Sequence, residues 1–138
     1  SDSKLRWEIL AREMGLGVDR VRFLGTLNRT QVRDWMQKCS VFVLPSRLET
    51  FGCVLAEAQA CGKPVVATRC GGPESIVTSE SGILVDDVDD YETLASVIDR
   101  IITRKIRFDS RLIREQAVNR FGRRNFVKSM FDLYSRFF

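Results

Sequence analysis

Three short apolar runs constrain the fold of this chain more than any other feature. They span 41–45, 65–68 and 82–85, and their hydrophobicity is continuous rather than alternating. A continuously apolar strand has to be buried on both faces, which is typical of a parallel sheet covered by helices. Helical stretches separate the runs, as the crossovers between parallel strands require. The pattern predicts an α/β fold with a Rossmann-like, doubly wound parallel sheet.

Apolar spacing and turn residues predict the remaining elements. These are a helix over 4–15, a strand over 21–25, a helix capped by Thr30 that passes through Met36, a helix from Phe51 to Cys61, a turn at 71–73 with a short helix through Ile76 and Val77, and helical structure from Asp90 with breaks near 108–109 and 121–122. No internal repeat and no flexible linker divides the chain.

The bulk composition is that of one globular domain. The 138 residues are 44% hydrophobic and 29% charged, which is sufficient for a single core. No apolar stretch is long enough to cross a bilayer, and the first residues lack the apolar region of a signal peptide. We therefore expect a single domain over 1–138 that works in the cytoplasm.

The chain contains no histidine and four cysteines. The cysteines are Cys39, Cys53, Cys61 and Cys70, with spacings of 14, 8 and 9 and no CxxC pair. This pattern does not fit a zinc site and indicates reduced thiols in a cytosolic protein. Without histidine, Ser-His and Cys-His pairs are excluded, so a catalytic base has to be a carboxylate or lie outside this chain.

Positive charge is concentrated in the C-terminal part of the chain. Residues 1–99 carry 11 basic and 15 acidic side chains, whereas 100–138 carry 11 basic and 3 acidic ones. Such a tail is typical of a surface that touches phosphates or the inner face of an anionic membrane. It is equally typical of helices with solvated Lys and Arg, which we favour. We expect no nucleic-acid partner, and peripheral membrane contact stays the alternative.

Two carboxylates follow the first buried run at a spacing of eight residues. Glu49 lies in the loop after the strand and Glu57 in the second turn of the following helix. In open α/β sheets, ligands bind at the carboxyl ends of strands, where a helix N-terminus offers unpaired N–H groups. Gly52 lets a ligand approach the backbone closely. The arrangement suits a sugar joined to phosphate, but a solvated Glu49 and a Glu57 that only favours its helix dipole fit the spacing equally well.

The surroundings of these acids closely resemble the C-terminal, donor-binding domain of retaining GT-B glycosyltransferases, in the glycosyltransferase group 1 or GT4-like family. The resemblance covers nearly the whole chain. Its motifs are Pro45-Ser46-Arg47-Leu48-Glu49-Thr50-Phe51-Gly52, Glu57-Ala58-Gln59-Ala60-Cys61-Gly62-Lys63-Pro64-Val65-Val66-Ala67-Thr68, Gly71-Gly72, Val21-Arg22-Phe23-Leu24-Gly25, Gly82-Ile83-Leu84-Val85 and Phe121-Gly122 with the aromatic helix after it.

The resemblance implies a role for each site residue. Glu57 would hold the ribose hydroxyls of a nucleotide sugar, and Glu49 would contact the donor sugar near the reacting centre as the catalytic residue. Backbone N–H groups would bind the donor sugar and diphosphate at Phe51, Gly52, Cys53 and Val54. Gly25 and Thr26 fall where the family lines its base pocket.

The resemblance further implies transfer of a sugar from a nucleotide-diphosphate sugar with retention of configuration and without a metal, as in glycan or cell-envelope polysaccharide biosynthesis. The family's donor domain begins with two more strands and supplies an Arg and a Lys for the diphosphate, and an N-terminal domain holds the acceptor. We expect this chain to be a part lacking all of these, inactive in isolation because the amides supply only some of the positive charge that the leaving group needs.

Several alternatives stay open. The run Asp86-Asp87-Val88-Asp89-Asp90 could be read as a metal or calcium site, but it lacks the Gly and the distal Glu of an EF-hand, and we expect one Asp to cap a helix. Gly71 to Glu74 fits a phosphate loop or, as we favour, a tight turn. A nucleotide-sugar epimerase of the same architecture and a non-catalytic nucleotide-binding or interaction module are the rival functions. The terminal aromatic stripe fits a membrane helix or packing across a domain boundary; it comprises Phe126, Val127, Met130, Phe131, Tyr134, Phe137 and Phe138.

Overall fold

The computed structural model describes residues 2–125. Its elements in chain order are α1 (Asp2–Glu13), α2 (Arg29–Lys38), β1 (Phe42–Leu44), α3 (Cys53–Ala60), β2 (Val65–Thr68), α4 (Gly72–Ile76), β3 (Gly82–Val85), α5 (Tyr91–Ile102) and α6 (Ser110–Phe121). The chain divides into two compact units, Ser1–Val32 and Arg33–Phe138, and each is described by itself. The predicted aromatic stripe from Phe126 onward lies outside the described residues.

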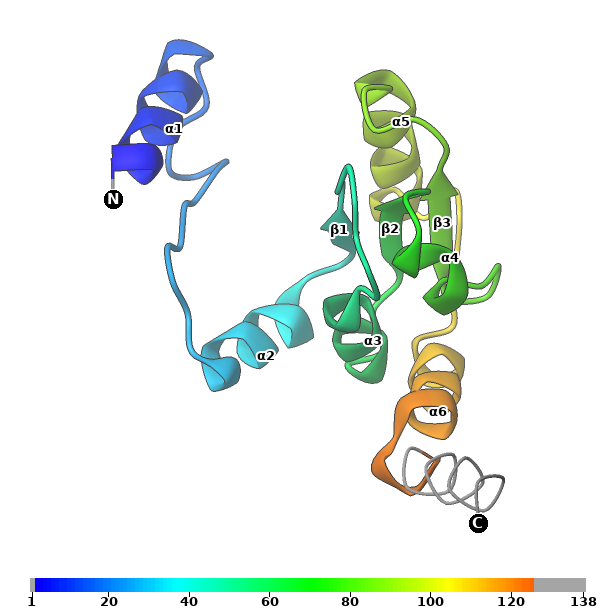
Figure 1. Ribbon diagram of the computed structural model, residues 1–138. Helices are drawn as coiled ribbons and strands as arrows, with labels where there is room; N and C mark the ends of the chain where they lie inside the picture. The colour runs from blue at the N-terminus through cyan, green and yellow to red at the C-terminus, as the bar shows by residue number, and fades with distance from the viewer. Residues whose placement is uncertain (1, 126–138) are drawn as a thin grey trace. The chain divides into compact units, whose positions relative to one another are not determined.

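The second unit is built on a three-stranded parallel sheet in the order β1-β2-β3 (Figure 1). In its register Val43 lies beside Val66, and Val66 beside Ile83. All four residues of β2 are buried, as expected of a central strand covered on both faces. The predicted α/β fold with a parallel sheet is therefore confirmed, and β2 and β3 have the predicted bounds.

One face of the sheet packs against α5. Because side chains alternate along a strand, Val43, Val66 and Ile83 point to the same side. There they join an apolar cluster with Val97 and Ile101 of α5, which are 8% and 7% exposed. Asp90 caps this helix by accepting a hydrogen bond from the amide of Thr93 over 2.9 Å. The predicted Asp cap is confirmed.

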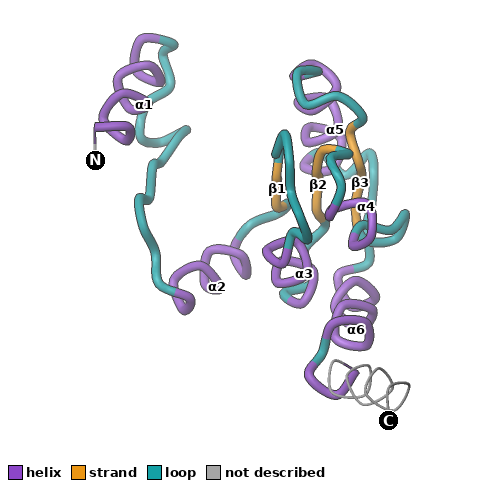
Figure 2. The backbone as a smooth tube through the Cα atoms, viewed as in Figure 1, coloured by secondary structure: helices purple, strands orange, loops and turns teal. Residues whose placement is uncertain are grey.

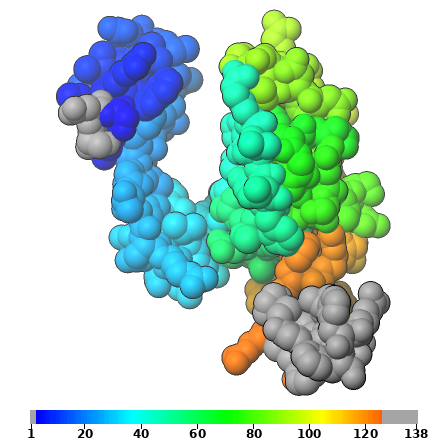
Figure 3. Space-filling view, viewed as in Figure 1, coloured from blue at the N-terminus to red at the C-terminus, as the bar shows by residue number. Residues whose placement is uncertain are grey.

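The opposite face is covered by α3, with α4 and α6 beside it. Leu55 of α3 and Ile113 of α6 are both 0% exposed, and the two helices pack against each other. Figure 3 shows the orange atoms of α6 in contact with the teal and green atoms of the rest of this unit. Arg120 fastens α6 to the end of α4 by donating hydrogen bonds to the carbonyls of Ile76 and Ser75 over 2.9 and 2.6 Å.

The N-terminal unit contains α1 and an irregular segment leading into α2. The strand predicted over 21–25 is wrong, because this segment has no regular structure. A strand needs a neighbour for its backbone groups, and the described part of this unit contains no other strand. No helix among residues 2–125 is both long and apolar enough to cross a membrane.

The cap predicted at Thr30 is also wrong. The helix α2 begins at Arg29, and Asn28 precedes it as the capping residue. The side chain of Asn28 accepts from the amide of Gln31 over 2.9 Å, while the side chain of Gln31 accepts from the amide of Asn28 over 3.0 Å. This reciprocal pair is a capping box, and it satisfies two otherwise unpaired backbone donors.

Candidate functional site

The loops that follow β1, β2 and β3 lie at one edge of the sheet. Because the strands are parallel, their carboxyl ends point the same way, and the teal loops leave them at the same end (Figure 2). The loop after β1 carries Glu49, and the loop after β2 carries Gly71. Ligands of open α/β sheets bind at this edge, so the predicted site falls where the architecture favours one.

The N-terminus of α3 has no side-chain cap. Its N-cap residue is Gly52, whose backbone is left-handed with φ 79° and ψ 42°. A side chain at this residue would be strained by that conformation, so glycine lets the loop turn directly into the helix. The first amides of the helix, at Cys53 and Val54, lack the capping acceptor that many helices have. This end can therefore accept an anion through backbone N–H groups and the helix dipole.

The loop that carries Glu49 is joined to the glycine pair after β2. The carbonyl of Glu49 accepts a hydrogen bond from the amide of Gly72 over 2.8 Å, and Glu49 forms an isolated parallel bridge with Gly71. A Cβ on Gly72 would lie only 2.5–2.6 Å from the backbone of Phe51. The two loops can approach this closely because Gly72 has no side chain.

The two predicted carboxylates differ in exposure. Glu49 is half-buried in the loop, whereas Glu57 is exposed in the second turn of α3. Phe51 is 49% exposed and Cys53 is exposed, but Gly52 between them is buried. The close approach of a ligand expected at Gly52 is not seen, because side chains of this unit already surround that residue. The structure thus presents one carboxylate from the loop, one from the helix, and the uncapped amides between them.

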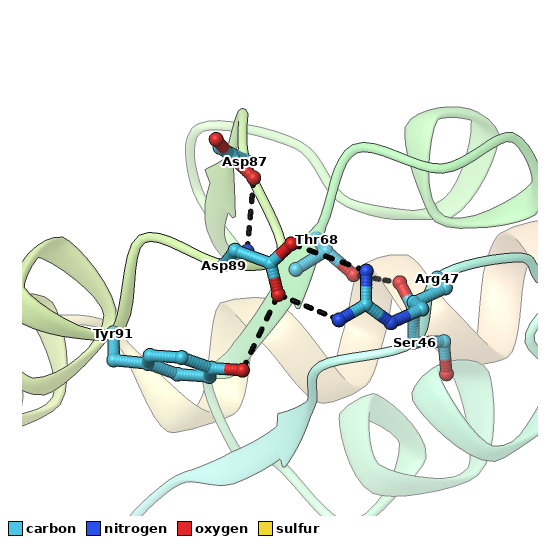
Figure 4. Close-up of polar contacts among 6 residues, drawn as sticks. All are labelled: Ser46, Arg47, Thr68, Asp87, Asp89 and Tyr91. Carbon is cyan, nitrogen blue, oxygen red and sulfur yellow. Dashed lines mark hydrogen bonds and ion pairs between the residues drawn. The ribbon is translucent and has the colours of Figure 1, made fainter.

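A bidentate ion pair crosses the same edge (Figure 4). Arg47, in the loop after β1, donates to both carboxylate oxygens of Asp89 over 2.6 and 3.2 Å. The Tyr91 hydroxyl donates to Asp89 over 3.3 Å. The hydrogen bond from Arg47 is the main reason that the pKa of Asp89 is lowered and that of Arg47 raised. The hydroxyl of Thr68 also donates to the Ser46 carbonyl, which ties β2 to this loop.

A second arginine at this edge is Arg69, directly after β2. Its guanidinium donates to Asp86 over 2.7 Å and contacts Glu74 over 3.4 Å. The sequence interpretation assigned no role to Arg47 or Arg69. Their positions, in the loops that follow two neighbouring strands of the sheet, are the signal that would have identified them.

The acidic run after β3 is structural in the described chain. Asp86 pairs with Arg69, Asp89 pairs with Arg47, and Asp90 caps α5. Asp87 accepts a hydrogen bond from the amide of Asp89 over 2.9 Å. Within residues 2–125 no group of three or more acidic or cysteine side chains is placed to hold a metal ion. The turn predicted at 71–73 is not formed as predicted, because α4 already begins at Gly72 with Gly71 as its N-cap, and Val77 lies just beyond the helix in an extended conformation.

The predicted base-pocket residues Gly25 and Thr26 belong to the N-terminal unit. That unit has a cleft of about 340 Å³ between α1 and the segment 16–24, and neither residue lines it. Their assignment therefore rests on the resemblance and stays a prediction.

Comparison with known proteins identifies the family. The family described as glycosyl transferases group 1 matches residues 2–104. A D-inositol 3-phosphate glycosyltransferase of Catenulispora acidiphila is 38% identical over 130 residues, which is 92% of this chain and 30% of that protein. The enzyme of the same description in Mycolicibacterium smegmatis is 43% identical over 95 residues, or 66% of this chain and 22% of that protein. The chain thus spans about a third or less of these relatives.

Solved structures agree with this result. Sucrose-phosphate synthase from Thermosynechococcus elongatus has a TM-score of 0.84 and 34% identity, covering 99% of this chain and 35% of that one. Anabaena HepE in complex with UDP has a TM-score of 0.81 and 28% identity, covering 98% of this chain and 37% of that one. The fold is that of part of the C-terminal half of a GT-B glycosyltransferase. This chain belongs to the glycosyl transferases group 1 family.

Proposed function

We propose that this chain is the donor-binding part of a glycosyltransferase that transfers a sugar from a nucleotide-diphosphate sugar to an acceptor with retention of configuration. The observation that carries the proposal is the uncapped N-terminus of α3, set between Glu49 and Glu57 at the carboxyl edge of the sheet. In a group 1 glycosyltransferase, this combination of amides and carboxylates matches a ligand that joins phosphates to hydroxyls.

The nature of the donor is supported by HepE of Anabaena. Its solved structures contain UDP, UDP with glucose, or UDP-glucose, and they share 27–28% identity with this chain over 98% of its length. UDP-glucose is therefore the donor with which we would begin. The rival epimerase and the non-catalytic module have no comparable observation in their favour.

Each site residue has a distinct part in the proposed reaction. The exposed carboxylate of Glu57 accepts hydrogen bonds from the ribose hydroxyls and orients the nucleotide. The amides of Phe51, Gly52, Cys53 and Val54 face the donor sugar and diphosphate. The half-buried Glu49 lies closest to the reacting carbon and positions the sugar ring. No metal is required in this scheme.

The bond changes follow from these positions. The bond between the anomeric carbon and the diphosphate oxygen breaks, and the electron pair leaves with the diphosphate. The acceptor hydroxyl bonds to the anomeric carbon from the same face, which retains the configuration. Its proton passes to the departing phosphate oxygen, which leaves from the same face of the sugar ring. The amides at the start of α3 stabilise part of the charge on the leaving group.

Binding of UDP to this chain tests the nucleotide assignment. We compare Glu57→Gln with Glu92→Gln, an exposed acid in the first turn of α5. Loss of charged hydrogen bonds worth about 1.5–3 kcal/mol weakens UDP binding roughly tenfold or more in Glu57→Gln. The Glu92→Gln variant keeps wild-type affinity in the same calorimetric titration. Wild-type UDP affinity in Glu57→Gln would remove the ribose assignment.

Turnover is tested on the longer protein that contains this chain. With UDP-glucose as donor, Glu49→Gln should lower kcat more than it weakens donor binding, because Glu49 acts at the reacting sugar. NMR of the product reports whether the anomeric configuration is retained. Formation of an epimer of the donor without transfer would instead establish the rival epimerase.

A further inference from the structure

The second unit has a large cleft at the amino edge of its sheet, away from the proposed donor site. Its volume is about 540 Å³, and it is lined by the ends of α2, α5 and the turn after α3, together with the connection from α5 to α6. Ser40 lies just before β1, and Pro64 lies just before β2. These positions are at the opposite strand ends from Glu49, so the cleft is separate from the donor site.

Four cations line this cleft, and no acidic residue does. They are Lys38, Lys63, Arg104 and Arg107. Arg104 and Arg107 belong to the segment 100–107, which contains four basic residues and no acidic one. None of the four cleft cations forms an ion pair within residues 2–125, whereas Arg47 and Arg69 at the other edge both do. Unneutralised cations around one cavity produce a positive potential that attracts anions.

Helix ends offset only part of this charge. The C-termini of α2 and α5 lie at the cleft, and each carries about half a negative charge, so they sum to roughly −1. Cations at helix C-termini are an ordinary stabilising feature, and Lys38 in the last turn of α2 fits that role. Four positive charges exceed this sum even when the carboxylate of Asp109 is counted, which lies between the lining residues Phe108 and Ser110 and caps α6.

The lining of the cleft also includes apolar side chains. Ile106 and Phe108 line it and pack against the core cluster that contains Ile101. Cys39 also lines it, and burial raises the pKa of its thiol although the charge of Lys63 opposes the rise.

One residue that lines the cleft, Arg104, has a strained backbone conformation. Arg104 has φ 58°, and it is the one non-glycine residue with positive φ in the described chain. A left-handed conformation costs an L-residue about 1–2 kcal/mol. The amide of Ile106 donates to the Arg100 carbonyl over 2.9 Å, which closes the turn after α5 around Arg104. Glycine would adopt this left-handed conformation without strain, but the residue here is arginine, and its guanidinium lies at the cleft.

We propose that this cleft is a second binding site, which takes a phosphate-bearing ligand. The phosphate contacts Lys63 and Arg107, with Lys38 and Arg104 around it, while an apolar part of the ligand packs on Ile106 and Phe108. The shared chemistry is a phosphate ester or diphosphate, supplied either by a free metabolite or by an anionic lipid headgroup. This inference is independent of the donor site and adds a ligand to the proposed function.

Titration of the 138-residue chain with inorganic pyrophosphate, followed by two-dimensional NMR, tests the site. The test variant is Lys63→Gln with Arg107→Gln, and the matched control is Arg111→Gln with Arg114→Gln, which removes two exposed charges from α6 outside the cleft. We expect amide shifts at residues 39–40, 63 and 104–110. Affinity should fall at least tenfold in the test variant and less than twofold in the control. Thermal unfolding of both variants establishes that they fold.

Cosedimentation with vesicles distinguishes the two ligand sources. Vesicles of phosphatidylglycerol, compared with phosphatidylcholine, should retain the wild-type chain and release the Lys63, Arg107 variant if the ligand is a lipid headgroup. Pyrophosphate shifts without vesicle binding indicate a free phosphate ester. The proposal is overturned if neither probe binds, if shifts are confined to 49–57, or if both double variants lose affinity equally. It is likewise overturned if the Lys63, Arg107 variant has a lower unfolding temperature but keeps its affinity for pyrophosphate. The two cations would then stabilise helix C-termini without binding a ligand.

Discussion

The backbone amide of Gly72 donates a hydrogen bond to the carbonyl of Glu49 over 2.8 Å. These residues lie in the loops that follow two neighbouring parallel strands, so the bond joins the loops at the edge where the donor site is proposed. Glu49 lies beside the uncapped end of α3, because a Cβ on Gly52 would be 3.5 Å from the Cγ of Glu49. The position of the proposed catalytic carboxylate therefore depends on a glycine in another loop.

Replacing Gly72 by alanine tests this dependence. The new Cβ would meet the backbone of Phe51 at 2.5–2.6 Å, and backbone cannot rotate out of the way. We expect the free energy of unfolding to fall by roughly 1–3 kcal/mol and UDP binding to weaken together. Gly15→Ala is the control, because its Cβ has open space and only the left-handed backbone is strained. Urea unfolding and UDP titration report both effects, and unchanged UDP binding in Gly72→Ala would contradict the coupling.

The ion pair between Arg47 and Asp89 predicts the pH response of this edge. The pKa of Asp89 is lowered in the folded chain, mainly by the hydrogen bond from Arg47. A depressed carboxyl pKa means that the pair contributes stability above the ordinary value of 3.8, and that this contribution is lost as pH falls through the folded value. Titration by carbon-detected NMR should place the Asp89 midpoint below 3.8.

Two variants show whether the low Asp89 midpoint is caused by Arg47 or by the positive charge of the chain in general. In Arg47→Gln the Asp89 midpoint should return toward its ordinary value, because the donor of the main hydrogen bond is gone. In Arg114→Gln, which removes an exposed charge on α6, it should stay low. An Asp89 midpoint that is the same in wild type and Arg47→Gln would show that the pair does not persist in solution.

A buried polar contact fastens α3 to the turn before β3. Gln59 and Ser81 are both 1% exposed, and the Gln59 amide donates to the Ser81 hydroxyl over 3.1 Å. Ser81→Ala leaves a buried donor without its acceptor, which costs about 1–3 kcal/mol of unfolding free energy. Ser79→Ala, two positions away and exposed, should change it by less than about 0.5 kcal/mol. Equal costs in denaturant unfolding would rule out this contact as the cause.

Packing of α6 is tested by two neighbouring residues. Ile113 is 0% exposed and faces α3, whereas Leu112 is 39% exposed. Ile113→Ala creates a cavity and should lower the free energy of unfolding by about 2–5 kcal/mol. Leu112→Ala should cost clearly less, because much of its side chain already faces water. If thermal or urea unfolding shows similar losses for both, α6 does not pack on α3 as described.

Most strands and helices of the second unit could be predicted from the sequence. Continuous apolar runs predicted three strands, and these runs became β1, β2 and β3. The predicted burial is confirmed for β2, whereas β1 is half-buried and spans only Phe42–Leu44 of the run predicted over 41–45. The segment 21–25 carries a similar signal but is not a strand, because pairing requires a partner that the local sequence does not supply. At the start of α2, Asn28 followed by Gln31 was the capping signal, and Thr30 is also a good capping residue, so composition alone favoured the wrong one.

Some features of the candidate site could likewise be predicted from the sequence, and others could not. The glutamates, the glycine and the apolar strand could be proposed as a site from the sequence because strand, loop and helix N-terminus are contiguous in the chain, and their roles stay a prediction. The role of Gly72 could not be predicted from the sequence. A tight turn and a close approach to the backbone of Phe51 both require glycine, so the residue type does not tell them apart. The ion pairs of Arg47 and Arg69 could not be predicted either, because their partners, Asp89 and Asp86, come from a different loop.

The sequence by itself determined which segments form the strands of the sheet, roughly where the helices lie, and which residue types stand at the carboxyl edge. These properties depend on neighbours along the chain, through hydrophobic periodicity and capping. Only the tertiary structure decided that Arg47 meets Asp89, 42 positions away, that Gly72 holds Glu49, and that Lys63 and Arg107 face one cleft. Such contacts depend on strand register and on the crossover helices, which bring together residues that no local pattern relates.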